Sequence, residues 1–118
     1  MSDRRLSPPS GYPPPPEYRE QAQEVCRRHF ELHPDQVERY GEHGMAWCVH
    51  DLQHILSWAS YDANGHLDME KEVRWLAGVL AARDFPIQTL ADDLEIAAEV
   101  VPEFAGRLRE VAEVVRAM

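Results

Sequence analysis

Residues 43–61 read HGMAWCVHDLQHILSWASY, and the apolar side chains of this stretch recur at the spacing of an α-helix. On a helical wheel, one set of them falls within about 100° of arc and forms an ordinary core stripe. That set is Met45, Val49, Leu52, Ile55, Leu56 and Ala59, with Cys48 just inside its edge. The pattern predicts a helix over residues 43–62 that ends at Asn64 and Gly65.

The opposite face of this helix is also uncharged, because a second set of side chains lies within about 80° of arc there. It consists of His43, Trp47, His50, His54, Trp58 and Tyr61. No lysine, arginine or glutamate interrupts it, although the solvated face of a helix normally carries such charges. Asp51 lies between this face and Cys48. A second uncharged face predicts that something touches it.

Three interpretations of the second face remain open. A neighbouring helix or a second protomer would cover it, since aromatic residues are enriched at interfaces. A flat, conjugated ligand would pack against its Trp and Tyr rings. A metal ion would use histidines spaced i, i+4, as His50 and His54 are. His29 and His33 share that spacing, but no CxxC or HExxH motif accompanies either pair, and His29 sits in an apolar stripe typical of a core histidine. We therefore predict no metal site unless haem is bound.

The rest of the chain after residue 16 also has helical periodicity. Further amphipathic helices are expected over about 17–32, 34–40, 69–85, 87–101 and 104–118. No segment alternates with a period of two residues, so no sheet is expected. Joints at prolines 34, 86 and 102 suggest helices that cross at varied angles. These features predict one compact all-α domain over 17–118, of five to six helices, in a globin-like arrangement.

The charge balance constrains the partners. The formal net charge of −9 argues against nucleic acid as the main partner, because an acidic surface repels phosphate backbones. No apolar run approaches the length of a membrane span, and the N-terminus has no apolar signal segment. A cytoplasmic protein is therefore expected, with Cys26 and Cys48 as free thiols.

Residues 1–16 differ in composition from the rest of the chain. Six of the ten residues from 7 to 16 are prolines, so we expect a flexible, disordered, polyproline-like tail. A floppy leader is the simpler interpretation. Recruitment of a protein partner with a proline-binding module is the alternative.

The segment from Met45 to Tyr61 resembles the chromophore-bearing helix of the phycobiliproteins, whose pattern is close to M-A-x-C-x-R-D-x-x-x-I-L-x-x-x-x-Y. The matching positions are Met45, Ala46, Cys48, Asp51, Ile55, Leu56 and Tyr61. A weaker similarity continues from Leu67 through AARDFP to about Val101. Phycobiliproteins are globin-like all-α proteins that carry linear tetrapyrroles.

The resemblance implies roles for two residues. Cys48 resembles the cysteine that forms a thioether with the bilin, and Asp51 resembles the acid that hydrogen-bonds the pyrrole nitrogens. The family's arginine before that acid is His50 here, and its arginine pair before Met-Ala is His43 and Gly44. The Pro-rich tail stands in place of the family's N-terminal helical hairpin. The chain therefore looks more like the shortened, stand-alone relatives called photoglobins.

These observations predict a non-catalytic sensor or binding domain that holds a tetrapyrrole, either a bilin or a haem-like ring. The expected contact residues are His43, Trp47, Cys48, His50, Asp51, His54, Trp58 and Tyr61. If haem is bound, His54 is the first candidate axial ligand and His50 the second. No nucleophile motif or Gly-rich phosphate loop favours an enzyme. The alternative is a ligand-free homodimeric interaction module that uses the same aromatic face.

Overall fold

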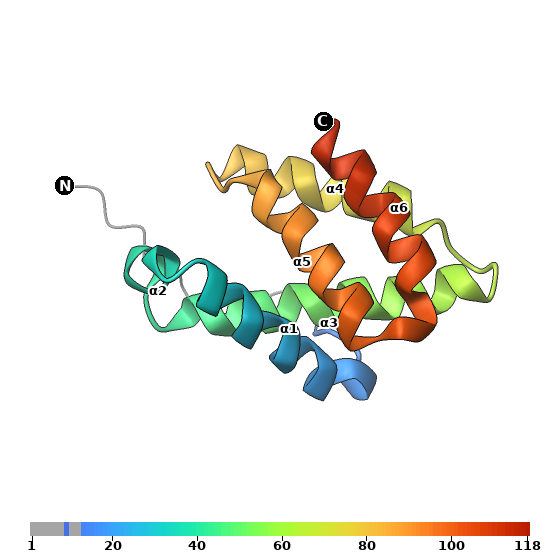
Figure 1. Ribbon diagram of the computed structural model, residues 1–118, viewed down its shortest axis with the longest axis horizontal. Helices are drawn as coiled ribbons and strands as arrows, with labels where there is room; N and C mark the ends of the chain where they lie inside the picture. Colours follow the sequence, from blue (N-terminus) through green and yellow to red (C-terminus); the bar gives the residue numbers. More distant parts are fainter. Residues whose placement is uncertain (1–8, 10–12) are drawn as a thin grey trace.

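The protein is all-helical in the computed structural model, which describes residue 9 and residues 13–118 (Figure 1). No strand occurs in that part of the chain. The elements are η1 (Pro16–Tyr18), α1 (Arg19–Leu32), α2 (Asp35–Tyr40), α3 (His43–Ala63), α4 (Met69–Ala82), α5 (Ile87–Val100), η2 (Pro102–Phe104) and α6 (Ala105–Arg116). The predicted all-α class is therefore confirmed, and six helices form one compact body.

Local signals set the helix boundaries. The side chain of Asp68 caps α4 by accepting a hydrogen bond of 3.0 Å from the backbone N–H of Glu70. Gly65 follows α3 with φ of 74°, a left-handed conformation that glycine adopts without strain. Pro86 and Pro102 stand immediately before α5 and at the start of η2, where a missing backbone N–H costs little.

Helix α3 spans the length of the molecule, and α1, α2 and α4 pack against it (Figure 1). Helices α5 and α6 form the most extensive pairing, and α1 packs against both α3 and α5. The core stripe of α3 is confirmed at Leu52, Ile55, Leu56 and Ala59, which are buried. Met45 is 41% exposed, which makes its assignment to the core wrong. The first turn of α3, which contains Met45, lies at the end of the molecule beside α2, with fewer helices against it (Figure 1).

A disulfide joins α1 to α3, through Cys26 and Cys48. Their Cα atoms are 5.9 Å apart, a separation suited to such a bond. The prediction of two free thiols is therefore wrong. The two cysteines meet because the buried face of α1 packs on the edge of the core stripe of α3, a contact that spans 22 residues of sequence.

The chain just before α1 lies against α3. The side-chain amide of Gln53 donates a hydrogen bond of 3.2 Å to the carbonyl of Pro15, and the Tyr18 ring packs edge-on against Phe104. Residues 1–8 and 10–12 of the predicted flexible tail lie outside the described residues. Among the helices described, none is long and apolar enough to cross a membrane.

Candidate ligand pocket

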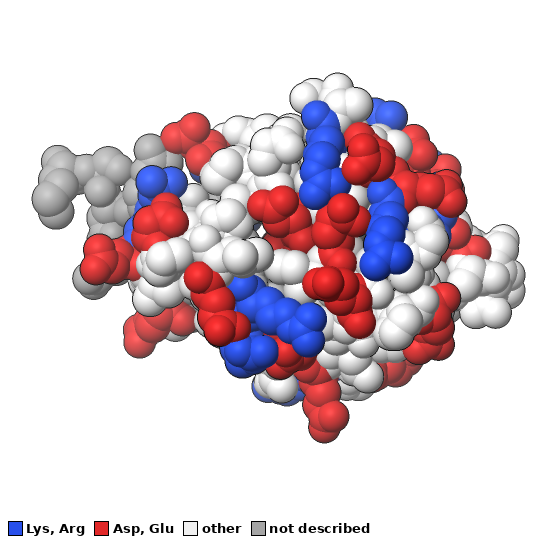
Figure 2. Space-filling model, in the orientation of Figure 1, with Lys and Arg blue, Asp and Glu red and all other residues white. Residues whose placement is uncertain are grey.

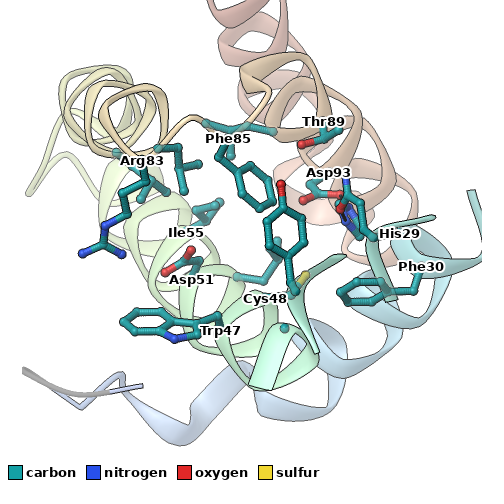
Figure 3. Close-up of a pocket in the computed structure, with 17 residues that line it drawn as sticks. His29, Phe30, Trp47, Cys48, Asp51, Ile55, Arg83, Phe85, Thr89 and Asp93 are labelled. Atoms are coloured by element: carbon teal, nitrogen blue, oxygen red, sulfur yellow. Dashed lines mark hydrogen bonds and ion pairs between the residues drawn. The ribbon is translucent and has the colours of Figure 1, made fainter. Parts of the chain in front are cut away.

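A cavity of about 270 Å³ lies beside the N-terminal half of α3 (Figure 3). Helices α1 to α5 and the joint between α4 and α5 all contribute to its wall. The lining is mainly apolar and aromatic, with a few polar groups, which is the composition typical of small-molecule sites. Its lining residues are His29, Phe30, Gln36, Tyr40, Gly44, Trp47, Cys48, Asp51, Leu52, Ile55, Leu76, Leu80, Arg83, Phe85, Thr89, Leu90 and Asp93.

Trp47, Asp51 and Arg83 lie together at one side of the pocket (Figure 3). The Arg83 guanidinium lies 5.6 Å from the centre of the Trp47 ring, within the range of a cation–π contact. Arg83 is exposed, whereas Trp47 and Asp51 are half-buried. This part of the wall therefore reaches the surface and presents an indole face, a carboxylate and a cation to whatever enters.

Two stacked rings form another part of the wall. The rings of Tyr40 and Phe85 lie 4.8 Å apart with an angle of 26° between their planes. Tyr40 is only 6% exposed, and its hydroxyl has no hydrogen-bond partner among the described residues. A buried hydroxyl without a partner costs about 1–3 kcal/mol. The pocket therefore holds a polar group whose hydrogen bond is not supplied by the fold.

A buried histidine–carboxylate pair joins α1 to α5 in the pocket wall. His29 Nδ1 lies 2.6 Å from Asp93 Oδ1, and His29 Nε2 lies 2.6 Å from Gln36 Oε1. All three residues are buried. Because both neighbouring atoms are oxygens that accept, both ring nitrogens donate when His29 is an imidazolium.

The protonation of His29 follows from this arrangement. Burial alone lowers the pKa of an imidazole, but the bond to the Asp93 carboxylate, the charge of that carboxylate and the bond to Gln36 outweigh it. The pKa of His29 is therefore raised above 6.5. A charged His29 paired with Asp93 is electrically neutral as a unit, as a buried ion must be.

The structure divides the eight predicted site residues into two groups. Trp47, Cys48 and Asp51 line the pocket. The other five, His43, His50, His54, Trp58 and Tyr61, do not line it. This cavity therefore touches the aromatic face only at Trp47, and ligand binding along the rest of that face stays a prediction.

The rings of four residues form a continuous row along α3, from Trp47 at the pocket to Trp58. Ring centres are 5.2 Å apart between Trp47 and His50, 4.9 Å between His50 and His54, and 6.1 Å between His54 and Trp58. His50 Nδ1 also lies 3.3 Å from Asp51 Oδ1. Tyr61, beyond the far end of this row, is 50% exposed. The candidate haem ligands His50 and His54 therefore lie outside the 270 Å³ cavity.

Sequence reasoning did not predict several residues of the pocket. His29 was expected to be a satisfied core histidine, and its two hydrogen bonds confirm that. Asp93 lies at the edge of the apolar stripe of α5, beside Leu90 and Ala97, and a carboxylate in that position was a usable signal of a buried partner. Tyr40 and Phe85 gave no comparable signal, because their meeting depends on how α2 packs against the joint after α4.

The surface over α1, α5 and α6 mixes charges of both signs (Figure 2). Arg116 contacts Glu95 at 3.3 Å and Asp92 at 3.6 Å, and Arg28 contacts Glu99 at 3.9 Å. On this face the basic side chains are interleaved with acidic ones. Such a surface offers no continuous basic patch for a phosphate backbone.

Comparison with known proteins adds no relative. No known protein family matches the chain, and no curated protein or solved structure matches it either. The resemblance to phycobiliproteins therefore stays a prediction.

Proposed function

We propose that this protein is a non-catalytic binding domain for a flat, conjugated small molecule held in the 270 Å³ pocket. The observation that carries the proposal is the Tyr40 hydroxyl, which is buried in the pocket wall and has no hydrogen-bond partner in the described part of the chain. A ligand atom that accepts or donates a hydrogen bond there would remove the desolvation cost that the free protein bears.

The lining determines the chemistry of the ligand. The Tyr40–Phe85 stack and the Trp47 ring favour a planar, aromatic or conjugated body. The Asp51 carboxylate favours N–H groups or a cationic nitrogen at the end that faces the surface. The ligand would thus be a planar heterocycle with one polar group for Tyr40 and a nitrogen for Asp51.

The volume limits the size of the ligand. A cavity of about 150 Å³ holds a benzene ring, so about 270 Å³ encloses roughly eleven non-hydrogen atoms at the same density. The four rings of a tetrapyrrole alone exceed that count. A bilin or haem therefore does not fit inside whole. If one binds, a single ring would enter beside Tyr40 and the rest would lie outside, near Trp47 and Arg83.

A thioether at Cys48 requires a free thiol. The Cys48 sulfur is bonded to Cys26, so covalent attachment does not fit the disulfide-bonded form. We therefore propose non-covalent binding. The globin-like arrangement belongs to the same proposal, and helices that cross at varied angles around a pocket support it (Figure 1).

Titration of the purified full chain tests the proposal. Trp fluorescence and thermal shift would be measured with indole, quinoline, biliverdin and haemin, using the wild type and Tyr40→Phe. We expect a one- or two-ring compound to bind and Tyr40→Phe to weaken it about tenfold, the worth of one hydrogen bond. Trp58→Phe, which lies outside the pocket, serves as the control. Equal affinity in Tyr40→Phe and wild type for every binder would contradict the proposal.

The homodimeric interaction module remains the second candidate. It is favoured by the exposed Tyr61 beyond the end of the aromatic row. Tyr61→Glu would convert a dimer into a monomer in a measurement of mass in solution if this surface is the interface. A monomeric wild type would exclude this candidate.

A further inference from the structure

Three metal-ligating side chains converge on the wall of the pocket. A ring nitrogen of His29, the Cys48 sulfur and an Asp93 carboxylate oxygen all lie within 4.8 Å of one another. Figure 3 shows them on neighbouring walls, with His29 on α1, Cys48 on α3 and Asp93 on α5. In the disulfide-bonded protein the sulfur is committed to Cys26, so the set is incomplete.

We propose that opening the Cys26–Cys48 disulfide creates a site for a divalent zinc ion, held by His29, Cys48 and Asp93. The proposal does not depend on the ligand suggested above. One imidazole, one thiolate and one carboxylate are ligands that zinc accepts together in tetrahedral sites. Three protein ligands leave a fourth position for water or for a molecule in the pocket, as in sites where zinc acts on a ligand.

The geometry requires only small movements. Around a tetrahedral zinc, a sulfur and a nitrogen ligand lie about 3.5 Å apart, from bond lengths of about 2.3 and 2.0 Å. The His29 nitrogen and the Asp93 oxygen, 2.6 Å apart, must separate slightly to admit the ion, and the Cys48 sulfur must approach them by about 1.3 Å or less from the limit of 4.8 Å. Rotation about the Cα–Cβ bond of Cys48 supplies that movement once its sulfur is released from Cys26.

The surroundings already orient the histidine. Gln36 Oε1, 2.6 Å from Nε2, accepts the hydrogen of that nitrogen and leaves Nδ1 to face Asp93. A histidine ligand usually donates its second ring N–H to such an oxygen, which fixes the ring orientation. The ion would then replace the proton that His29 and Asp93 share.

The charge also balances. One thiolate and one carboxylate neutralise a divalent cation, so the buried site has no net charge. A dithiol reductant opens the disulfide by supplying two electrons and two protons, and it becomes a disulfide itself. Zinc binding then releases the Cys48 proton and the proton of the His29–Asp93 pair. Cys26 stays a buried thiol.

Two single substitutions provide matched variants. Cys26→Ser and Cys48→Ser both remove the disulfide, so both variants lose the stability that it provides. Only Cys26→Ser keeps the Cys48 thiolate as a zinc ligand. Each full-length protein would be titrated with Co²⁺ as a spectroscopic probe and with Zn²⁺ against a chromophoric chelator. Wild type would be measured before and after reduction, and every folded state would be checked by circular dichroism.

We expect a thiolate-to-cobalt charge-transfer band in Cys26→Ser without reductant and in reduced wild type. We expect no band in Cys48→Ser or in oxidised wild type. Asp93→Asn in the reduced state should lose at least about tenfold in zinc affinity. Absence of the band from Cys26→Ser, or equal zinc affinity in the two serine variants, would overturn the proposal. If neither serine variant folds, reduced wild type decides the question. Absence of the band from reduced wild type, or equal zinc affinity in reduced wild type and reduced Asp93→Asn, would overturn the proposal.

Discussion

The substitution Tyr40→Phe should stabilise the free protein. It removes only a hydroxyl that is buried in a 6% exposed residue and has no hydrogen-bond partner among the described residues. A buried, unpaired polar group costs about 1–3 kcal/mol, and phenylalanine keeps the ring that stacks on Phe85. Because Tyr40 lines an existing cavity, removing one oxygen atom from it adds little empty volume to the core. We expect a gain of about 1–2 kcal/mol in the free energy of unfolding.

Urea unfolding followed by circular dichroism measures this gain. The midpoint should rise while the slope with denaturant stays the same, since the surface exposed on unfolding is unchanged. The melting temperature should rise by about 4 °C for each kcal/mol in a domain of this size. A substitution that raises stability and lowers ligand affinity is typical of a residue whose role is in binding.

Tyr61→Phe is the control, because Tyr61 is 50% exposed and its hydroxyl can reach water. Its effect should stay within about 0.5 kcal/mol. If the midpoint of Tyr40→Phe is unchanged or falls, the Tyr40 hydroxyl is satisfied in the free protein. The reasoning that links it to a ligand would then be refuted.

Three further predictions concern what holds the pocket walls together. Asp93→Ala should lower the free energy of unfolding, measured in urea, by about 3–5 kcal/mol, because it leaves His29 buried without its counter-charge. The control, Asp92→Ala at the surface, should lower it by no more than about 1 kcal/mol. Because the pKa of His29 is raised in the folded protein, the stability it contributes is complete below pH 6.5 and is lost as pH rises through the folded pKa. Unfolding measured from pH 6 upward should show this decline, and Asp93→Asn should flatten it. Reduction of the Cys26–Cys48 bond, which closes a loop of 22 residues, should lower the free energy of unfolding by about 3 kcal/mol, and an unchanged urea midpoint under dithiol would contradict this.

The helices were predictable because their signals are local. The segments predicted over 17–32 and 43–62 correspond to Arg19–Leu32 and His43–Ala63. Prolines, glycines and the capping Asp68 mark the ends of helices within a few residues of sequence, whatever the rest of the chain does. The periodicity of 43–62 also identified the buried residues Leu52, Ile55, Leu56 and Ala59 correctly.

The pocket was only partly predictable because it depends on which helices face one another. A helical wheel placed Cys48 and Asp51 at the boundary between the two faces of α3, and they do line the cavity. His29 and Asp93 are 64 residues apart in the sequence. The periodicity of each helix indicates which of its faces is buried but not which residue of another helix that face contacts. The disulfide was missed for the same reason, since the expectation of free thiols rested on the expected compartment and took no account of the distance between Cys26 and Cys48.

NMR mapping of a bound ligand on the protein shows whether the cavity beside α3 is the binding site. Amide resonances of uniformly ¹⁵N-labelled protein would be followed during titration with the best ring compound found by thermal shift. We expect shifts concentrated at Tyr40, Trp47, Asp51 and Arg83–Phe85, and smaller shifts in Tyr40→Phe at the same subsaturating ligand concentration. Shifts centred on His54, Trp58 and Tyr61, with the residues around Tyr40 unmoved, would contradict it.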